Sequence, residues 1–359
     1  MKATTCAMAV TLALGLCIAA IGSAADGRAA NQGLDPLDPL VLPAVRTPRA
    51  AQSVLVAITR AGERLIAAGE SGVVLTSDDD GQSWTQAEVP VSVTLTSVQF
   101  VTPLIGWAVG HSGVVLSSVD GGRSWSKKFD GLQRVQAQAP GGAPQGGMAA
   151  AGGASDPLLD IHFLDAQHGF AVGAFGLLLR TRDGGARWES WEKHLPNPEG
   201  NHLYGVRSAG DQVYVVGERG SIYASRDRGE TFTALKSPYE GSFFGLIVAP
   251  GGAVVVYGLR GRAFASEDQG DTWHPVDVVA GSAWTGAAAM PDKRMALVGQ
   301  AGDVAVGDEH GRAFAPVGGR RASLSAAVVN RRGDLVAVGP RGVLVIDMSS
   351  LKRQQGGKS

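Results

Sequence analysis

The stretch GESGVVLTSDDDGQSW, residues 69–84, joins two patterns that recur along the whole chain. It begins with a Gly-x-x-Gly step that follows an apolar run, and it ends in Ser-x-Asp-x-Gly-x-x-Trp. Seven segments carry the glycine step, with first glycines at Gly69, Gly110, Gly173, Gly217, Gly258, Gly299 and Gly339. Their intervals are 41, 63, 44, 41, 41 and 40 residues. A fixed period of this size indicates a repeat architecture.

The second pattern keeps a constant distance from the first. In five units an aspartate lies ten residues after the first glycine and is followed by a glycine and an aromatic residue. The five aspartates are Asp79, Asp120, Asp183, Asp227 and Asp268. Unit six is reduced to GDEHGRAF, residues 307–314, with Glu309 in the aspartate position, and unit seven has lost the pattern. Five copies in register exclude a chance repeat.

Short apolar runs separate the turn motifs. LTSVQFV (residues 95–101), IGWAVG (105–110) and GVVLSS (113–118) are rich in β-branched residues and are bounded by turn residues, as is typical of strands. No long stretch has the 3.6-residue period of a helix. The chain is therefore predicted to be all-β, with a seven-bladed β-propeller of four-stranded antiparallel blades over residues 51–348.

Unit seven ends before a fourth strand can form. Residues 26–50 precede the first blade, and within them Leu34–Ala50 is the segment able to supply the missing strand. Proline is tolerated on an outermost strand, because one edge of that strand has no partner. We expect this segment to lie beside Val343–Ile346 and to close the ring.

One interval is longer than the others because of an insertion, residues 131–157. It is composed mainly of Gly, Ala, Pro and Gln and has few large apolar side chains. Such a segment buries too little surface to order itself, so it is predicted to be a flexible loop. Residues 349–359 form a polar tail.

The first 25 residues have the pattern of a signal peptide. A lysine precedes an apolar run, and small residues follow at Gly22–Ala25. Leu16 precedes Cys17 where a lipoprotein signal has a small residue, and the run is short for a retained membrane anchor. The mature chain is expected to be exported, for example to the periplasm, not to span a membrane, and to lack cysteine.

Composition narrows the function classes. Glycine accounts for 51 of 359 residues without a Gly-x-y period, and 44% of the residues are hydrophobic, so collagen and wholesale disorder are excluded. Lys and Arg number 32 against 33 Asp and Glu, which argues against a nucleic-acid partner. The seven histidines lack a metal-binding spacing and no Gly-x-Ser-x-Gly occurs, so no metal, cofactor or serine nucleophile is expected.

The repeat resembles the Asp-box, or bacterial neuraminidase repeat. Combined with the glycine step at a 41-residue period, it resembles the photosystem II stability/assembly factor-like family of exported seven-bladed propellers over about Val54–Ile346. The resemblance implies a non-enzymatic scaffold or assembly factor for a membrane-protein complex. For proteobacterial members it implies exporters of the resistance-nodulation-division type as partners.

Asp boxes also occur in sialidases and xyloglucan hydrolases, so a glycan-binding or glycoside-hydrolysing propeller is the alternative. Aspartates on separate blades are too dispersed to form the carboxylate pair that glycoside hydrolysis needs. We therefore expect the five Asp-box carboxylates to stabilise their own hairpins and the protein not to be an enzyme.

The third residue of each glycine step offers a candidate binding face. Arg219, Arg260 and Arg341 hold this place in units four, five and seven. Aromatic residues that open inner strands should share their face, and arginine with aromatics is typical of binding hot spots. The predicted partner site comprises Arg219, Arg260, Arg341, Tyr204, Phe243 and Trp284. An arginine-rich face is also implied by the family resemblance. The alternative is that the arginines are solvated and that Phe243 and Trp284 fill the channel.

Overall fold

The computed structural model describes residues 35–138, 153–249, 251–278, 282–319 and 321–349. The chain divides into residues 1–35 and 36–359, and the fold described below belongs to the second unit. The predicted signal peptide, the middle of the insertion and nearly all of the polar tail lie outside the described residues. No helix within the described ranges is long and apolar enough to cross a membrane.

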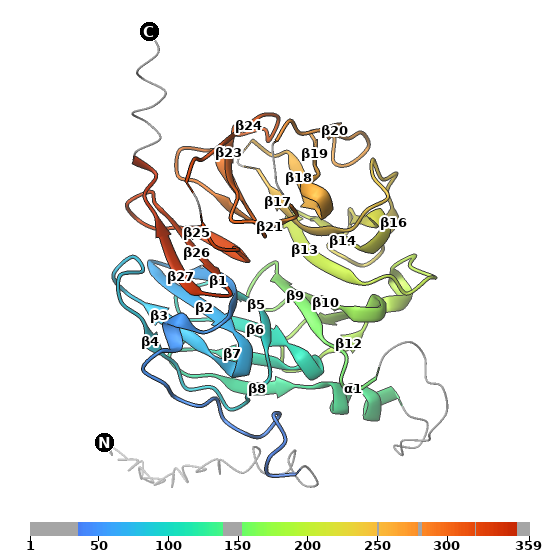
Figure 1. The fold of residues 1–359 in the computed structure, drawn as a ribbon. Helices are drawn as coiled ribbons and strands as arrows, with labels where there is room; N and C mark the ends of the chain where they lie inside the picture. Colours follow the sequence, from blue (N-terminus) through green and yellow to red (C-terminus); the bar gives the residue numbers. More distant parts are fainter. Residues whose placement is uncertain (1–34, 139–152, 250, 279–281, 320, 350–359) are drawn as a thin grey trace, which may run out of the picture. The chain divides into compact units, whose positions relative to one another are not determined.

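Seven antiparallel sheets follow one another along the chain as seven blades (Figure 1). The predicted seven-bladed propeller is confirmed. Six blades have four strands: β1 Leu55–Ala61, β2 Arg64–Gly69, β3 Val74–Ser77, β4 Thr85–Gln86; β5 Leu95–Phe100, β6 Gly106–Gly110, β7 Val115–Ser118, β8 Ser126–Phe129; β9 Leu158–Phe163, β10 Gly169–Gly173, β11 Leu178–Thr181, β12 Glu189–Ser190; β13 Leu203–Ala209, β14 Gln212–Gly217, β15 Ile222–Ser225, β16 Thr233–Ala234; β17 Phe243–Val248, β18 Val254–Gly258, β19 Ala263–Ser266, β20 His274–Pro275; β21 Trp284–Ala289, β22 Met295–Gly299, β23 Val304–Gly307, β24 Phe314–Pro316. Blade seven has three: β25 Ala326–Val329, β26 Leu335–Gly339 and β27 Gly342–Ile346.

The glycine step forms the turn between the second and third strands. In blades one to five it is a short 3-10 turn: η3 Glu70–Gly72, η4 His111–Gly113, η6 Ala174–Gly176, η8 Glu218–Gly220 and η9 Leu259–Gly261. A Cβ on Gly69 would lie 2.1 Å from the carbonyl oxygen of Val54, and Gly72 has φ +72°. The first glycine thus allows a close approach of the innermost strand, and the second provides a left-handed backbone.

Apolar side chains fill the spaces between neighbouring sheets. Trp107 of blade two, 2% exposed, stacks on Phe163 of blade three with ring centroids 3.5 Å apart. Its Nε1 donates to the carbonyl of Gly184 at 3.0 Å. Each sheet therefore buries both faces against its neighbours, which explains why its strands are apolar on both sides.

The Asp-box aspartates are engaged within their own hairpins. Asp79 accepts from the Ser83 backbone N–H at 2.9 Å, the Ser83 hydroxyl at 2.6 Å and the Ser77 hydroxyl at 2.8 Å. These bonds, led by that from the Ser83 side chain, lower the pKa of Asp79 to about 2. Asp120, Asp227 and Asp268 accept from the equivalent backbone N–H and both equivalent hydroxyls. Asp183 accepts from the Arg187 backbone N–H and the Thr181 hydroxyl. This geometry supports a structural role for the five carboxylates.

Unit six keeps the hairpin bond with a shifted residue. Asp308 accepts from the backbone N–H groups of His310 at 3.0 Å and Arg312 at 3.1 Å. Glu309, which aligns with the other aspartates, lies near His310 instead, with 3.7 Å between its Oε1 and the histidine Nε2. Asp308, one position before Glu309, therefore accepts the backbone hydrogen bonds of this turn.

The prediction of a ring-closing N-terminal strand is wrong. Residues 35–54 contain no strand, and blade seven has no fourth strand among the described residues. The segment first follows the outer edge of blade one, where Ala44 donates to the Val89 carbonyl at 3.1 Å and Ser92 donates to the Pro39 carbonyl at 2.8 Å. Its end, the 3-10 turn η2 Ala50–Gln52, reaches the start of β27, where a Cβ on Gly342 would lie 2.0 Å from the Ala51 carbonyl oxygen. Prolines at 36, 39, 43 and 48 remove backbone donors too often for a continuous ladder.

Blades one and seven close the ring through side chains. Asp80, next to the Asp-box aspartate, accepts from the Arg331 backbone N–H at 3.2 Å and from its Nε at 2.9 Å. Asn330 donates to the Asp80 carbonyl at 3.2 Å. An apolar cluster that includes Leu65 and Val336 fills the space between the two sheets.

The insertion begins with a helix rather than a loop. Helix α1, Gly131–Gln138, starts after Asp130, whose Oδ1 accepts from the Gln133 N–H at 3.0 Å. Gln133 accepts from the Asp130 N–H in return at 3.2 Å, which is a capping box. Arg134 joins the two ends of the insertion by donating to the Gly153 carbonyl at 2.7 Å. Residues 139–152 lie outside the described part of the chain.

The Asp80 contacts predict a stability effect. Replacing Asp80 with Asn keeps a residue that tolerates its left-handed backbone, φ +64°, but removes the charge facing Arg331. We expect Asp80→Asn to lower the free energy of unfolding by about 1–3 kcal/mol, measured by urea denaturation. Asp271→Asn, in an exposed pair with Arg226, should cost less than about 1 kcal/mol. Equal effects would contradict the assignment of Asp80 to ring closure.

Candidate partner-binding face

The third residue of the glycine step adopts the same backbone conformation in five successive blades. Its φ lies between 54° and 57° at Ser71, Ser112, Phe175, Arg219 and Arg260. Left-handed backbone costs an ordinary L-residue about 1–2 kcal/mol, so the turn geometry dictates where each side chain starts. These five side chains therefore leave their blades from equivalent points, whereas Arg341 does not share the left-handed backbone and stands in a tight turn between the paired residues Gly339 and Gly342.

The three predicted arginines are exposed. Arg219 forms an ion pair with Glu199 at 2.9 Å, in which the two side chains are 69% and 63% exposed. Arg260 and Arg341 form no ion pair with any described residue. Exposed pairs contribute little to stability, so Arg219 can exchange Glu199 for another carboxylate at low cost. Arg219 and Arg260 lie on adjacent blades, whereas blade six separates Arg341 from them.

A row of rings connects this rim with the channel. Phe175, 49% exposed, contacts His202 edge-on with centroids 4.8 Å apart. The Phe175 backbone N–H donates to His202 Nδ1 at 2.7 Å, which places the His202 proton on Nε2 when the ring is neutral. His202 is followed by Tyr204 at 6.2 Å and Phe244 at 5.5 Å beyond it. Phe175 occupies the third place of its glycine step, so its position was readable from the sequence.

Phe243 and Trp284 do not belong to this face, and their assignment to the partner site is wrong. Both are 0% exposed and pack between sheets, so they do not fill the channel either. The Trp284 Nε1 donates to the Gly261 carbonyl at 3.0 Å, which links blades six and five. Tyr204 lies one position further along its strand than Phe243 and Trp284 lie in theirs. Because successive side chains of a strand point to opposite faces, Tyr204 points the other way.

A β-bulge near the start of the inner strand in blades one to six turns one side chain toward the channel. In blade four, Leu203 pairs with Gly217 and Gly205 pairs with Val216, which leaves Tyr204 unpaired between them. The bulged residues of blades one to six are Val56, Thr96, Leu159, Tyr204, Phe244 and Thr285. All six line a cavity of about 360 Å³.

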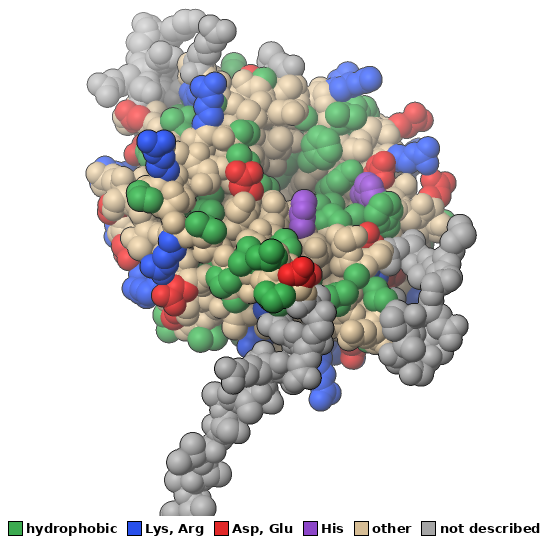
Figure 2. All heavy atoms as spheres, turned by 60° about the horizontal axis from the view of Figure 1, so that its bottom comes forward, with side chains coloured by type: hydrophobic (Ala, Val, Ile, Leu, Met, Phe, Trp, Pro, Cys, Tyr) green, Lys and Arg blue, Asp and Glu red, His purple; other side chains and the backbone are tan. Residues whose placement is uncertain are grey.

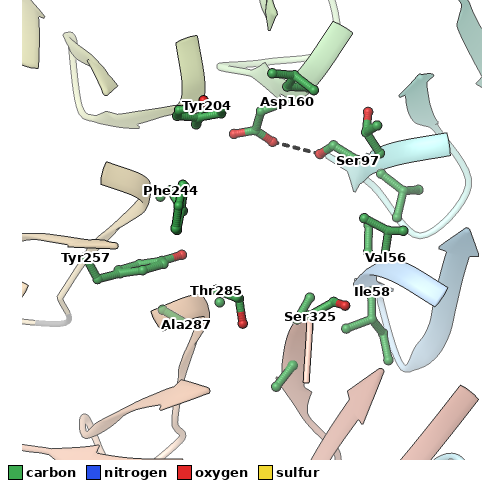
Figure 3. A pocket seen from close by; sticks show the side chains of 18 of the residues that line it. Val56, Ile58, Ser97, Asp160, Tyr204, Phe244, Tyr257, Thr285, Ala287 and Ser325 are labelled. Atoms are coloured by element: carbon green, nitrogen blue, oxygen red, sulfur yellow. Dashed lines mark hydrogen bonds between the residues drawn. The ribbon is translucent and has the colours of Figure 1, made fainter. Parts of the chain in front are cut away.

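Asp160 organises the polar side of this cavity (Figure 3). It accepts from the Ser97 hydroxyl at 2.7 Å and from the Val206 backbone N–H at 2.9 Å. It also forms an ion pair with Arg207, whose side chain is 39% exposed. Asp160, on the inner strand of blade three, therefore connects to the inner strands of blades two and four, and the positive charge of Arg207 compensates its negative charge.

Tyr257 reaches the cavity from the second strand of blade five. A Cβ on Gly245 would lie 2.5 Å from its hydroxyl, so this glycine gives the ring a path to the cavity. The hydroxyl points into the cavity in Figure 3 and has no hydrogen-bond partner among the described residues. Burial raises the pKa of Tyr257 to about 12, so the hydroxyl is a neutral donor.

Burial alone would lower the pKa of Arg207, but the Asp160 carboxylate raises it.

Charged side chains of both signs share the face that Figure 2 shows. Lys and Arg side chains are scattered over this face together with Asp and Glu. Within the described ranges no group of three or more His, Cys, Asp or Glu could hold a metal ion. Asp160 is the one carboxylate among the described residues that line the cavity.

Comparison with protein families matches residues 77–138 and 153–349 to the model described as photosynthesis system II assembly factor YCF48. The chain belongs to this family. The match covers most of the propeller, which confirms the family resemblance of the repeats. The curated relatives share shorter stretches: the photosystem II assembly lipoprotein Ycf48 of Synechococcus sp. (strain CC9902) is 35% identical over 77 residues, 21% of this chain and 23% of that protein. The aligned part thus spans less than a quarter of that relative.

Solved structures share the fold at low identity. A structure of YCF48 bound to a D1 peptide has a TM-score of 0.61 and 16% identity, covering 84% of this chain and 95% of the other. A GH74 enzyme of Niastella koreensis has a TM-score of 0.58 and 13% identity, covering 86% of this chain and 53% of the other. Identities this low establish the propeller alone.

His162, which lies beyond Asp160 on the same inner strand, predicts a pH effect. Burial, followed by the charge of Arg207, lowers its pKa to about 3, and its Nε2 lies 2.7 Å from the Ser208 hydroxyl. The unfolded chain binds this proton near pH 6.5, so stability falls as pH drops below 6.5 and continues to fall toward pH 3. Thermal unfolding should show a smaller loss between pH 7 and 5 for His162→Gln than for the native chain. An unchanged pH dependence would show that His162 is not held neutral.

Proposed function

We propose that this chain is an exported, non-enzymatic docking protein that binds a segment of a membrane-protein complex or of its assembly intermediate. The binding face comprises Phe175, Arg219 and Arg260 on three consecutive blades, with Tyr204 at the channel mouth and Arg341 beyond blade six. The observation that carries the proposal is the repeated left-handed turn, which presents an aromatic residue and two arginines side by side on a rigid rim.

The chemistry of this face suits a peptide segment with acidic residues. An arginine can bind a carboxylate through two parallel hydrogen bonds, and aromatic residues with arginine dominate binding hot spots. The turns are part of the propeller frame, so little order is lost on binding. Family membership supports the proposal, because a YCF48 structure contains a D1 peptide and relatives are named photosystem II assembly lipoproteins.

The identity of the partner complex is a more specific prediction than the docking role. The family resemblance implies exporters of the resistance-nodulation-division type for proteobacterial members, and we retain such an exporter as the specific partner to test. The predicted signal peptide, residues 1–25, which precedes the described residues, supports export to the periplasm or to another location outside the cytoplasm.

A non-enzymatic role is supported by the way the carboxylates are used. Glycoside hydrolysis needs two carboxyl groups facing each other at about 5–9.5 Å. The Asp-box carboxylates are bonded within separate hairpins, and Asp160 is paired with Arg207. The alternative of a glycan-active propeller has the fold of the GH74 enzyme in its favour.

Crosslinking in native cells tests the docking proposal. We expect the native chain to crosslink to a membrane protein, identified by mass spectrometry, and the Arg219→Ala/Arg260→Ala/Arg341→Ala variant to lose that crosslink. The matched control is Arg123→Ala/Arg187→Ala/Arg226→Ala, which removes three exposed arginines from the Asp-box face. Retention of the crosslink in the first variant, or equal loss in both, would refute the assigned face.

A glycan screen tests the alternative. The purified chain should neither hydrolyse nor bind sialosides and β-glucans. Turnover of any of these substrates would overturn the docking proposal in favour of the hydrolase.

A further inference from the structure

Blade seven differs from the other six at its outer edge. Its order is β25–β26–β27, whereas every other sheet has a fourth strand outside the third. In Figure 1 strand β27 is the outermost labelled strand of this sheet. The described residues therefore leave one position of a regular pattern empty.

The register identifies the backbone groups that this position would use. In blade one, Val74 pairs with the residue before the first glycine of the step, and its carbonyl accepts from the Ala87 N–H at 2.8 Å. Blades three to six repeat this bond, at 2.8–3.0 Å, to Leu178, Ile222, Ala263 and Val304. Val343 holds the same place in blade seven, since it pairs with Val338 before Gly339. No described residue donates to the Val343 carbonyl.

Strand β27 lacks the protection that free edges usually have. Because backbone groups alternate along an antiparallel strand, the N–H and C=O of Val343 and of Val345 point toward the empty position. Leu344 and Val345 are 37% and 43% exposed. Natural edge strands are blocked by lysine, proline or a bulge, and β27, with the sequence GVLVI, contains none of these.

A groove of about 350 Å³ runs along this edge. It is lined by residues 321–324 and 341–346, which include Arg321 and Arg341 and no acidic residue. Burial lowers the pKa of Arg321, whose guanidinium donates to the Val317 carbonyl at 3.1 Å. The groove thus combines an open strand edge, apolar side chains and positive charge.

We propose that β27 binds an extended segment of a partner protein as a fourth strand, and that this segment carries apolar residues alternating with acidic ones. Its N–H groups would donate to the Val343 and Val345 carbonyls, its apolar side chains would cover Leu344 or Val345, and its carboxylates would face Arg341 and Arg321. This mode of recognition is β-strand addition.

The occupant comes from another chain on grounds of charge and sequence. Residues 351–359, LKRQQGGKS, contain one large apolar residue and three positive charges, which Arg321 and Arg341 repel. Residues 36–47 contact blade one instead, and the turn Ala50–Gln52 meets β27 at its Gly342 end, away from the Val345 edge. The inference rests on the proposed function for the class of partner, a protein segment. Arg341 belongs to both surfaces, whereas Arg219 and Arg260 lie outside the groove.

The test uses the whole chain and a blocked eight-residue peptide of alternating valine and glutamate. We expect binding by calorimetry, and a loss of about tenfold or more in Val345→Pro, which removes one outward N–H and adds a ring at the edge. Val345→Thr keeps the N–H and the branching at Cβ, and its hydroxyl can reach water because Val345 is 43% exposed, so this variant should bind within about twofold. A peptide of alternating valine and lysine should bind more weakly than the glutamate peptide.

A measurement on the native chain guards against misfolding of the proline variant. Hydrogen exchange at the Val343 and Val345 amides should be fast in the free chain and should slow when the peptide is added. The Arg219→Ala/Arg260→Ala variant should bind the peptide as the native chain does, so failure of the edge and failure of the docking face give different results.

Other results would overturn the inference. Equal peptide affinity for Val345→Pro and the native chain, or unprotected Val343 and Val345 amides, would show that the edge is not used. Self-association of the native chain that Val345→Pro abolishes would assign the edge to a second copy. Tighter peptide binding after deletion of residues 351–359 would assign it to the chain's own tail.

Discussion

Coverage of both faces of every sheet is the constraint on which this structure depends. A blade whose strands are apolar on both sides, such as β6 with Trp107 and Ala108 on opposite faces, is stable only between two neighbours. Seven blades satisfy this requirement only as a closed ring, so the contact between the first and last blades matters as much as any other. Here that contact consists of an apolar cluster and the Asp80–Arg331 pair, without a sheet shared by the two ends of the propeller.

The repeat register was predictable because each motif residue has a local physical reason. Glycines sit where a Cβ would meet a carbonyl or where φ is positive, and the hairpin aspartates bind backbone N–H groups a few residues away. The helix after Asp130 also had a local signal, the capping box Asp-x-x-Gln, which the composition of the insertion concealed.

Other features depend on relations that a single sequence does not display. In each of blades four to six, the bulged residue, such as Tyr204, faces the channel, whereas the residue just before the bulge, such as Phe243 or Trp284, is buried between sheets. A shift of one residue along the strand therefore decides whether a side chain is in the channel or buried. The path of residues 36–50 was decided by spacing of prolines and by contacts with blade one. The Asp160–Arg207 pair joins residues 47 positions apart, for which no motif exists. For the candidate face, the places of Arg219, Arg260 and Phe175 could therefore be read from the repeat, but the contact of Phe175 with His202 and the polar cavity could not.

The tether at the base of the insertion separates that segment from the mechanics of the ring. Arg134 donates to the Gly153 carbonyl and lies 3.7 Å from Asp156. These contacts keep the two ends of the insertion together, between the last strand of blade two and the first strand of blade three. A sequence inserted between these two ends exerts little strain on the sheets, because the ends are already held close together. This makes residues 139–152 a natural graft point, where an epitope or a fluorescent domain could be carried by the propeller while every blade keeps its register.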